Sequence, residues 1–121
     1  MTSKKMVFVT THGTESPDLA SAPFVMANAA LASDMEAVIV LQSSSVYLAM
    51  KGMAGHVRAE AFPSLEDLIK SFFEQGGRMF VCVPCLKARG IDESQLIEGA
   101  KMASAATVVS EASTSDSTMV Y

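Results

Sequence analysis

Three short apolar runs without an internal polar residue are the feature that most constrains the fold of this chain. They occupy residues 6–9, 38–41 and 79–83. Strands that are covered on both faces read as continuous apolar runs, which is typical of parallel sheets with helices on either side. We therefore predict strands at residues 5–11, 36–42 and 78–83.

Helical segments separate these runs. Residues 64–75 predict the clearest helix, because Ser64 can cap it, apolar residues recur at helical spacing and Gly76 ends it. Residues 24–32 predict an Ala-rich helix with Pro23 in its first turn, after a polar loop at residues 11–18. Residues 46–50 predict a short helix, and residues 53–61 an irregular segment in which Val57 is the candidate for a brief strand.

The last third of the chain continues the alternation. A short helix is expected at residues 86–89 and another at 92–98, the second opened by a capping pair of Asp92 and Gln95. A strand at 101–103, a helix at 105–112 with Val108 and Val109 facing inward, and a strand at 118–121 complete it. Strand–helix repetition implies right-handed parallel crossovers. The prediction is one α/β domain over residues 1–121, a three-layer α/β/α sandwich with a mainly parallel sheet of about five strands.

Composition narrows the function classes. A net charge of −4 without basic clusters argues against a nucleic-acid surface. Nine Met residues among 50% apolar residues favour a homo-oligomer. No export signal or membrane span is expected, so a cytoplasmic protein with reduced thiols is predicted. Nucleotide-binding glycine motifs are absent from the sequence, and we expect no cofactor.

Both cysteines of the chain, Cys82 and Cys85, fall where the third strand gives way to a helix. In open α/β sheets, reactive groups collect at the carboxyl ends of strands. A helix start together with Lys87 and Arg89 would favour a thiolate at Cys85. The pair could alternate between dithiol and disulfide, or one thiol could carry sulfur as a persulfide. Equally, a cysteine inside a strand can simply fill the core.

His12 follows the first strand and could border the same edge, as a base or hydrogen-bond partner, or be an exposed loop residue. Together with His56 and the two cysteines it could form a zinc site, but the ligands lack the usual spacing, so no metal is expected. Residues near the strand ends could line a pocket or serve only as turn formers; they are Thr11, Gly13, Thr14, Ser43, Ser44, Pro84, Arg89 and Gly90.

Several stretches together resemble one known family. They are HGTESPD after the first strand, LAMKG at residues 48–52, PSLEDLIKSFFEQGG at residues 63–77 and, most specifically, VCVPCLKARGI at residues 81–91. Over nearly the whole chain, the pattern resembles the DsrE/DsrF-like sulfur-relay proteins, including the small YchN-like members. The resemblance implies a cytoplasmic α/β sandwich that assembles as trimers or hexamers.

The resemblance also implies a role for the thiols. Some relatives accept sulfur from a donor protein as a cysteine persulfide and hand it to an acceptor protein. Their reactive cysteine lies eight residues before the glycine of an Arg-Gly pair, which corresponds here to Cys82, with Cys85 as resolving or auxiliary thiol. The leading hypothesis is thus a persulfide carrier or sulfurtransferase. The alternatives are a non-catalytic oligomeric module that binds a small ligand or partner protein, and a dithiol redox protein.

Overall fold

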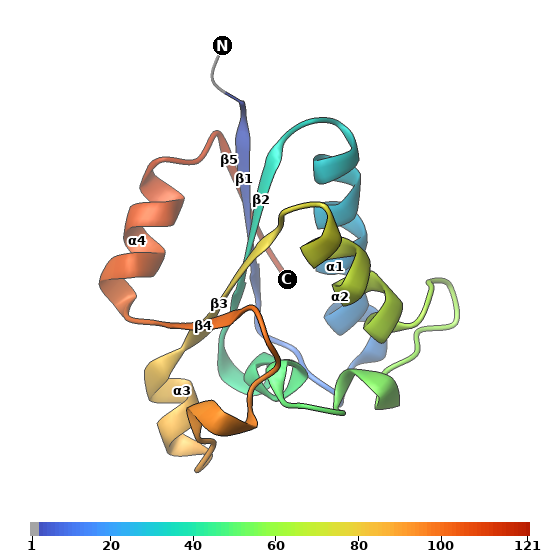
Figure 1. The fold of residues 1–121 in the computed structure, drawn as a ribbon, viewed down its shortest axis with the longest axis vertical. Coiled ribbons are helices and arrows are strands. Elements are labelled where there is room, and N and C mark those ends of the chain that lie inside the picture. Colours follow the sequence, from blue (N-terminus) through green and yellow to red (C-terminus); the bar gives the residue numbers. More distant parts are fainter. Residues whose placement is uncertain (1–2) are drawn as a thin grey trace.

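A five-stranded sheet organises the computed structural model, which describes residues 3–121. In this part of the chain all strand pairs are parallel and the order is β4-β3-β2-β1-β5 (Figure 1). The strands are β1 Lys5–Thr10, β2 Glu36–Leu41, β3 Arg78–Cys82, β4 Ala100–Ala103 and β5 Ser117–Val120. The predicted α/β class and all five predicted strands are confirmed.

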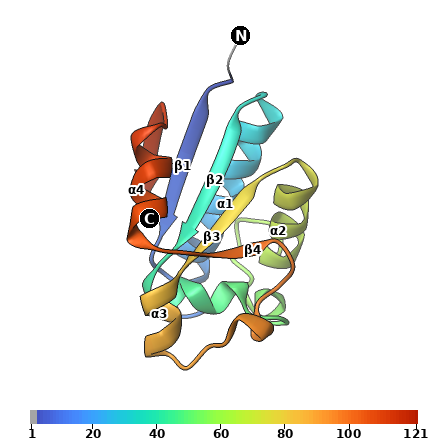
Figure 2. The same ribbon diagram turned by 60° about the vertical axis from the view of Figure 1, so that its left-hand side comes forward.

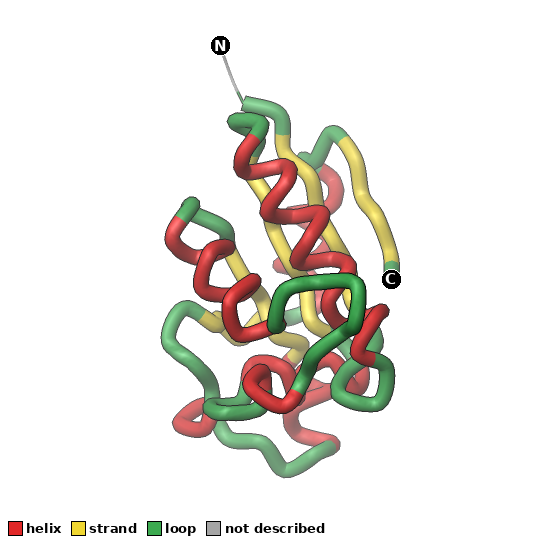
Figure 3. Tube along the Cα trace, turned by 90° about the vertical axis from the view of Figure 1, so that its right-hand side faces the viewer, coloured by secondary structure: helices red, strands yellow, loops and turns green. Residues whose placement is uncertain are grey.

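Helices cover the sheet on both faces. Helices α1 (Pro17–Ala32) and α2 (Leu65–Glu74) pack side by side on one face (Figures 1 and 3), and α4 (Ala105–Ser113) covers the other (Figure 2). Helix α3 (Val83–Ala88) follows β3 directly and extends beyond the edge where the strands end. The three-layer arrangement is therefore as predicted.

The α1/α2 face holds the main hydrophobic core. Phe8, Ile39 and Met79 from three neighbouring strands are fully buried there. Phe24 of α1 and Phe72 of α2 meet edge to face, with ring centroids 5.7 Å apart. Aromatic pairs in this geometry stabilise a core beyond the area that they bury.

The α4 face is packed much more lightly. Its buried cluster consists of Val7, Val38 and Val40, with Val108 of α4 only partly buried against it. Helix α4 has no buried residue at all, and Val109 is 65% exposed. The prediction that both Val108 and Val109 face inward is therefore wrong for Val109, because a single helix over the sheet can turn only a narrow stripe toward it.

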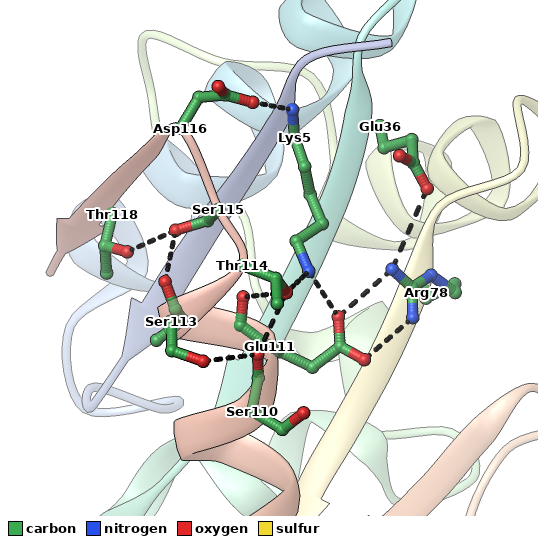
Figure 4. Close-up of polar contacts among 11 residues, drawn as sticks. Lys5, Glu36, Arg78, Ser110, Glu111, Ser113, Thr114, Ser115, Asp116 and Thr118 are labelled. Atoms are coloured by element: carbon green, nitrogen blue, oxygen red, sulfur yellow. Dashed lines mark hydrogen bonds and ion pairs between the residues drawn. The ribbon is translucent and has the colours of Figure 1, made fainter. Parts of the chain in front are cut away.

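Ion pairs connect the far end of α4 to the sheet (Figure 4). The Glu111 carboxylate pairs with Lys5 Nζ of β1 at 3.1 Å and accepts two hydrogen bonds from the Arg78 guanidinium of β3, at 3.0 and 3.1 Å. Lys5 Nζ also donates to Thr114 Oγ1 at 2.6 Å. We call these four residues the Glu111 cluster. Burial opposes ionisation of Glu111, but the hydrogen bonds from Arg78 and Lys5 outweigh it and lower its pKa.

Three helices begin earlier than predicted, and one of them is α3, which starts at Val83 rather than at residue 86. Helix α1 starts at Pro17, which suits a first helical position, and it continues through Pro23. Pro23 cannot donate a backbone hydrogen bond, but buried contacts of Ala20, Phe24 and Ala27 hold the helix on the sheet. The short helix predicted at 46–50 is a 3₁₀ helix over Ser43–Ala49.

Two other expectations were wrong. The capping box of Asp92 and Gln95 is present, but it opens only the 3₁₀ turn Glu93–Gln95 rather than a helix to residue 98. The chain instead stays extended at Leu96, which forms an antiparallel bridge with Met50. Val57 forms no strand; it is buried just after a 3₁₀ turn, Ala54–His56, so its hydrophobicity serves the core.

Candidate functional site: a thiol pair at the carboxyl edge of the sheet

The two cysteines lie at the junction between β3 and α3. Cys82 is the last residue of β3 and the N-cap of α3, and Cys85 lies in the first turn of this helix. Pro84 between them lacks a backbone N–H and so suits a first helical turn. Both thiols are free and only partly buried. The strand-to-helix junction therefore brings both predicted thiols to the carboxyl edge of the sheet.

The loop after β2 contacts Cys85 directly. The backbone N–H of Ser43 donates a hydrogen bond to Cys85 Sγ at 3.3 Å. Ser43 has a φ of 53°, in the left-handed region that residues other than glycine rarely adopt. Such a conformation costs on the order of 1 kcal/mol and persists only where the surroundings enforce it. The donor that faces this sulfur is therefore held in place by neighbouring structure.

That neighbouring structure is the loop after β1. The Glu15 carboxylate accepts the Gly13 N–H, at 2.7 Å from Oε2, and the Ser44 hydroxyl. A Cβ on Gly13 would lie 2.4 Å from the Ser44 carbonyl oxygen, so only glycine permits this approach. Slight burial raises the pKa of Glu15, but the hydrogen bonds from Ser44 and Gly13 prevail and lower it. One carboxylate thus joins the first two loops of the site.

His12 lies in the same loop but is bonded elsewhere. Its Nδ1 lies 3.2 Å from Thr11 Oγ1, which in turn donates to the Tyr121 carbonyl at 2.9 Å. In the described part of the chain, no hydrogen bond joins His12 to Cys82 or Cys85. The structure therefore places His12 among the loops at the carboxyl edge without a direct contact to sulfur.

Cys82 lines a cavity of about 220 Å³ between β3, β4 and α4. Burial raises the pKa of the Cys82 thiol, and the adjacent Cys85 thiol acts in the same direction, whereas the Cys85 backbone N–H and the Arg89 charge oppose the rise. The other lining residues are mostly apolar; they are Gln42, Pro84, Ala103, Ser104, Ala105, Val108 and Val109.

Most of the residues that line this cavity are not among those predicted from the sequence. Of the lining residues proposed from the sequence, only Pro84 borders this cavity, because the others belong to the loops after β1 and β2 or to the end of α3. The missing residues lie in the segment after β4. Because β4 pairs in parallel with β3, this segment starts next to the end of β3, where Cys82 lies. Knowledge of the strand order would have indicated residues 103–109.

The remaining predicted residues surround α3 and the first loop. Arg89 donates from Nη1 to the Cys85 carbonyl at 3.1 Å and lies 5.8 Å from the centre of the Tyr47 ring. Gly90 takes a φ of 65° directly after the helix, where a left-handed residue commonly ends it. Thr14 is exposed in the turn before α1. Arg89 is thus a cation near both thiols, and Gly90 fixes the end of its helix.

A second cavity, of about 250 Å³, lies away from the thiols. Met50, Ile69 and Ile97 form its apolar wall, and Glu66 borders it. Neither cysteine lines it, so the smaller cavity beside Cys82 is the one that concerns the chemistry. Among residues 3–121, no group of three His, Cys, Asp or Glu side chains is placed to hold a metal ion.

A parallel α/β sandwich with reactive groups at its carboxyl edge defines a broad class of proteins, and comparisons with known proteins narrow it. The chain belongs to the DsrE/DsrF-like family, whose model matches residues 4–121. This is a family of sulfur-relay type.

Two relatives and one solved structure illustrate the similarity. The uncharacterized protein MJ0760 of Methanocaldococcus jannaschii is 35% identical over 103 residues, which are 85% of this chain but only 38% of that protein. The uncharacterized protein MJ0989 of the same organism is 35% identical over 92 residues, covering 76% of this chain and 77% of that protein. The crystal structure of the ychN protein from E. coli shares the fold, with a TM-score of 0.82 at 17% identity over 98% of this chain and 99% of that one.

The chain thus spans well under half of the first of these relatives. Within the described residues, the helices are all too short or too polar to cross a membrane.

Proposed function

We propose that this protein is a sulfur-relay protein that carries sulfur as a persulfide on Cys82 and passes it to a partner protein. One observation carries the proposal. A free, half-buried thiol at the carboxyl edge of the sheet opens into a cavity and has a second thiol within one helical turn. Membership in a sulfur-relay family agrees with this arrangement.

The chemistry is a transfer of one sulfur atom between thiols. Cys82 attacks the outer sulfur of a donor persulfide, so that Cys82–SH and R–S–SH become Cys82–S–SH and R–SH. The S–S bond of the donor breaks, its thiolate leaves, and it takes up the proton that Cys82 loses. An acceptor thiol then attacks the outer sulfur on Cys82 and restores the Cys82 thiol. Atoms and electrons balance in both steps without a cofactor.

The surroundings of Cys82 suit carriage more than rapid attack. Burial raises the pKa of the Cys82 thiol, so less thiolate is present near neutral pH. The Arg89 charge and the Cys85 N–H favour the anion when the proton leaves.

Cys85 serves as the auxiliary thiol. Its sulfur accepts the Ser43 N–H, a contact that holds the thiol beside the loop after β2. If Cys85 attacks Cys82 Sγ in the persulfide, the Cys82–Cys85 bond forms and hydrosulfide leaves as the outer sulfur is reduced. A dithiol reductant must then reduce the disulfide. This side reaction would end a relay cycle in which no acceptor is bound.

We also propose that the protein forms a homo-oligomer, a trimer or hexamer, that exchanges sulfur with donor and acceptor proteins in the cytoplasm, where thiols stay reduced. Large apolar side chains at the surface support the oligomer. Met26, Met102 and Val120 are between 40% and 70% exposed.

The test is sulfur loading followed by intact-mass measurement. Reduced wild-type protein and the Cys82→Ser and Cys85→Ser variants are incubated with a persulfide donor, and masses are recorded with and without reductant. We expect a reductant-labile gain of one sulfur atom that is retained in Cys85→Ser and lost in Cys82→Ser. Circular dichroism establishes that each variant remains folded.

Other results assign the function differently. A gain that requires only Cys85 moves the carrier to that residue. A loss of two protons in wild type, with no sulfur gain in Cys85→Ser, indicates a dithiol redox protein, whose Cys82–Cys85 reduction potential then decides its role. No mass change in any variant rejects the sulfur-relay proposal.

A further inference from the structure

The cavity beside Cys82 has a mostly apolar lining. Ala103, Ala105, Val108 and Val109 line it beside the uncharged polar residues Gln42 and Ser104, and no charged residue of the described part of the chain, residues 3–121, lines it. Glu111, one turn beyond Val108 on α4, is already paired with Lys5 and Arg78. A donor whose sulfur reaches Cys82 along this wall must therefore lose water from whatever group it carries next to that sulfur.

The cost of desolvation should make this lining discriminate between charged and uncharged groups. Removal of water from an unpaired charged group costs far more than removal of water from an alkyl group, which burial stabilises. The cavity, at about 220 Å³, is smaller than the roughly 300–1,000 Å³ typical of pockets for drug-sized ligands, so it fits a group of a few carbon atoms.

Resting on the proposed function, we infer that the donor presents its sulfur to Cys82 as an organic persulfide, R–S–SH, in which the part of R next to the sulfur is small and uncharged, and that the cavity bordered by Val108 and Val109 binds this part. The transfer is the balanced exchange already described, with R–SH as leaving thiol. Anionic donors such as thiosulfate are excluded as efficient substrates by the same wall.

Two cations near Cys82 would by themselves favour anionic reagents. Arg89 acts electrostatically on Cys82, and the exposed Lys101 lies two positions before Ala103 on β4. Both charges attract anions toward this edge. A preference for an uncharged reagent must therefore arise from the apolar wall and not from the overall field.

The experiment uses methanethiosulfonates, which transfer an R–S group to a thiol with loss of methanesulfinate and report access to Cys82 without requiring persulfide chemistry. Ethyl, 2-sulfonatoethyl and 2-trimethylammonioethyl reagents differ in charge at similar length. Their rates with the Cys85→Ser protein are measured by intact mass and divided by the rates for the same protein unfolded in urea. We expect a normalised preference for ethyl over sulfonatoethyl of about tenfold, the equivalent of 1.4 kcal/mol.

Val109 supplies a matched pair of variants at an exposed position, where substitution is tolerated. Val109→Lys places a positive charge at the wall, and Val109→Gln changes polarity without charge. We expect Val109→Lys to reduce the ethyl preference far more than Val109→Gln. Equal normalised rates for the ethyl and sulfonatoethyl reagents, or equal effects of the two variants, would overturn the inference.

Sulfur loading separates this inference from the proposed function. If the cavity selects the ethyl reagent but Cys82 never retains sulfur from a donor, the sulfur-relay function fails while the cavity keeps its selectivity. If Cys82 retains sulfur but shows no charge selectivity, the relay function stands and the inference on the donor is wrong.

Discussion

Strand β3 presents two different surfaces. Met79 and Val81 are fully buried on the side of α1 and α2, whereas Arg78, Phe80 and Cys82 on the alternate side are only partly buried. Neighbouring strands repeat the contrast: Ile39 and Leu41 of β2 belong to the large core, and Val38 and Val40 to the small cluster under α4.

The two faces are stabilised by different forces. The α1/α2 face relies on close-packed apolar side chains, whose burial is the dominant favourable term in folding. On the α4 face, by contrast, only a few valines are buried, and the ion pairs of the Glu111 cluster add stability at one end. The other end holds the cavity beside Cys82. A lightly packed layer leaves room for a reactant, so the proposed chemistry lies on the face that contributes less to stability.

The largest effect is expected from a cavity in the main core. Phe72→Ala removes a fully buried ring that contacts Phe24, and it should lower the free energy of unfolding by about 3–5 kcal/mol. Urea denaturation monitored by circular dichroism measures it. The matched change on the other face, Val108→Ala, should cost about 1 kcal/mol or less, because this side chain is only partly buried. Similar losses for the two variants would refute the contrast between the faces.

Glu111→Gln should have the next largest effect. It leaves Lys5, which is 9% exposed, without its carboxylate partner and removes a charge-assisted pair with Arg78. We expect a loss of about 1–3 kcal/mol, between the values for exposed and for fully buried ion pairs. Glu98→Gln, at an exposed position, is the control and should stay within about 0.5 kcal/mol of wild type. A Glu111→Gln protein as stable as this control would mean that α4 is held by packing alone.

The stability difference between wild type and Glu111→Gln should also depend on pH. Lys5 of β1 and Arg78 of β3 face this carboxylate, and Glu36 of β2 lies 3.9 Å from Arg78. Because the folded-state pKa of Glu111 lies below its ordinary value of 4.5, the unfolded chain binds this proton first as pH falls. The contribution should therefore be fully present above pH 4.5 and decline below it. A difference that stays constant as pH falls through and below 4.5 would contradict the lowered pKa.

The sequence predicted the buried face better than the site. Continuous apolar runs and the Ser64 cap indicated β1, β2, β3 and α2, because periodicity and capping are local properties. The positions of Cys82 and Cys85 at the carboxyl edge followed from strand order along the chain. The Ser43 N–H at Cys85 could not be predicted, since it depends on a left-handed φ that Gly13 and Glu15 enforce from another loop. The sequence predicts that both Val108 and Val109 face inward, because periodicity cannot show how narrow a stripe of α4 faces the sheet.

The smallest effect is expected at Val109, and it sharpens the comparison most. Because its side chain is 65% exposed, Val109→Ser should change the free energy of unfolding by no more than about 0.5 kcal/mol. Val40→Ser, on the same face but fully buried, should cost more than about 2 kcal/mol, through the lost packing and the buried hydroxyl. Urea denaturation at two protein concentrations measures both. If Val109→Ser proves costly and its midpoint rises with protein concentration, a second copy covers Val109 in solution, since association stabilises a protein by mass action. The α4 face would then complete its packing only in the oligomer.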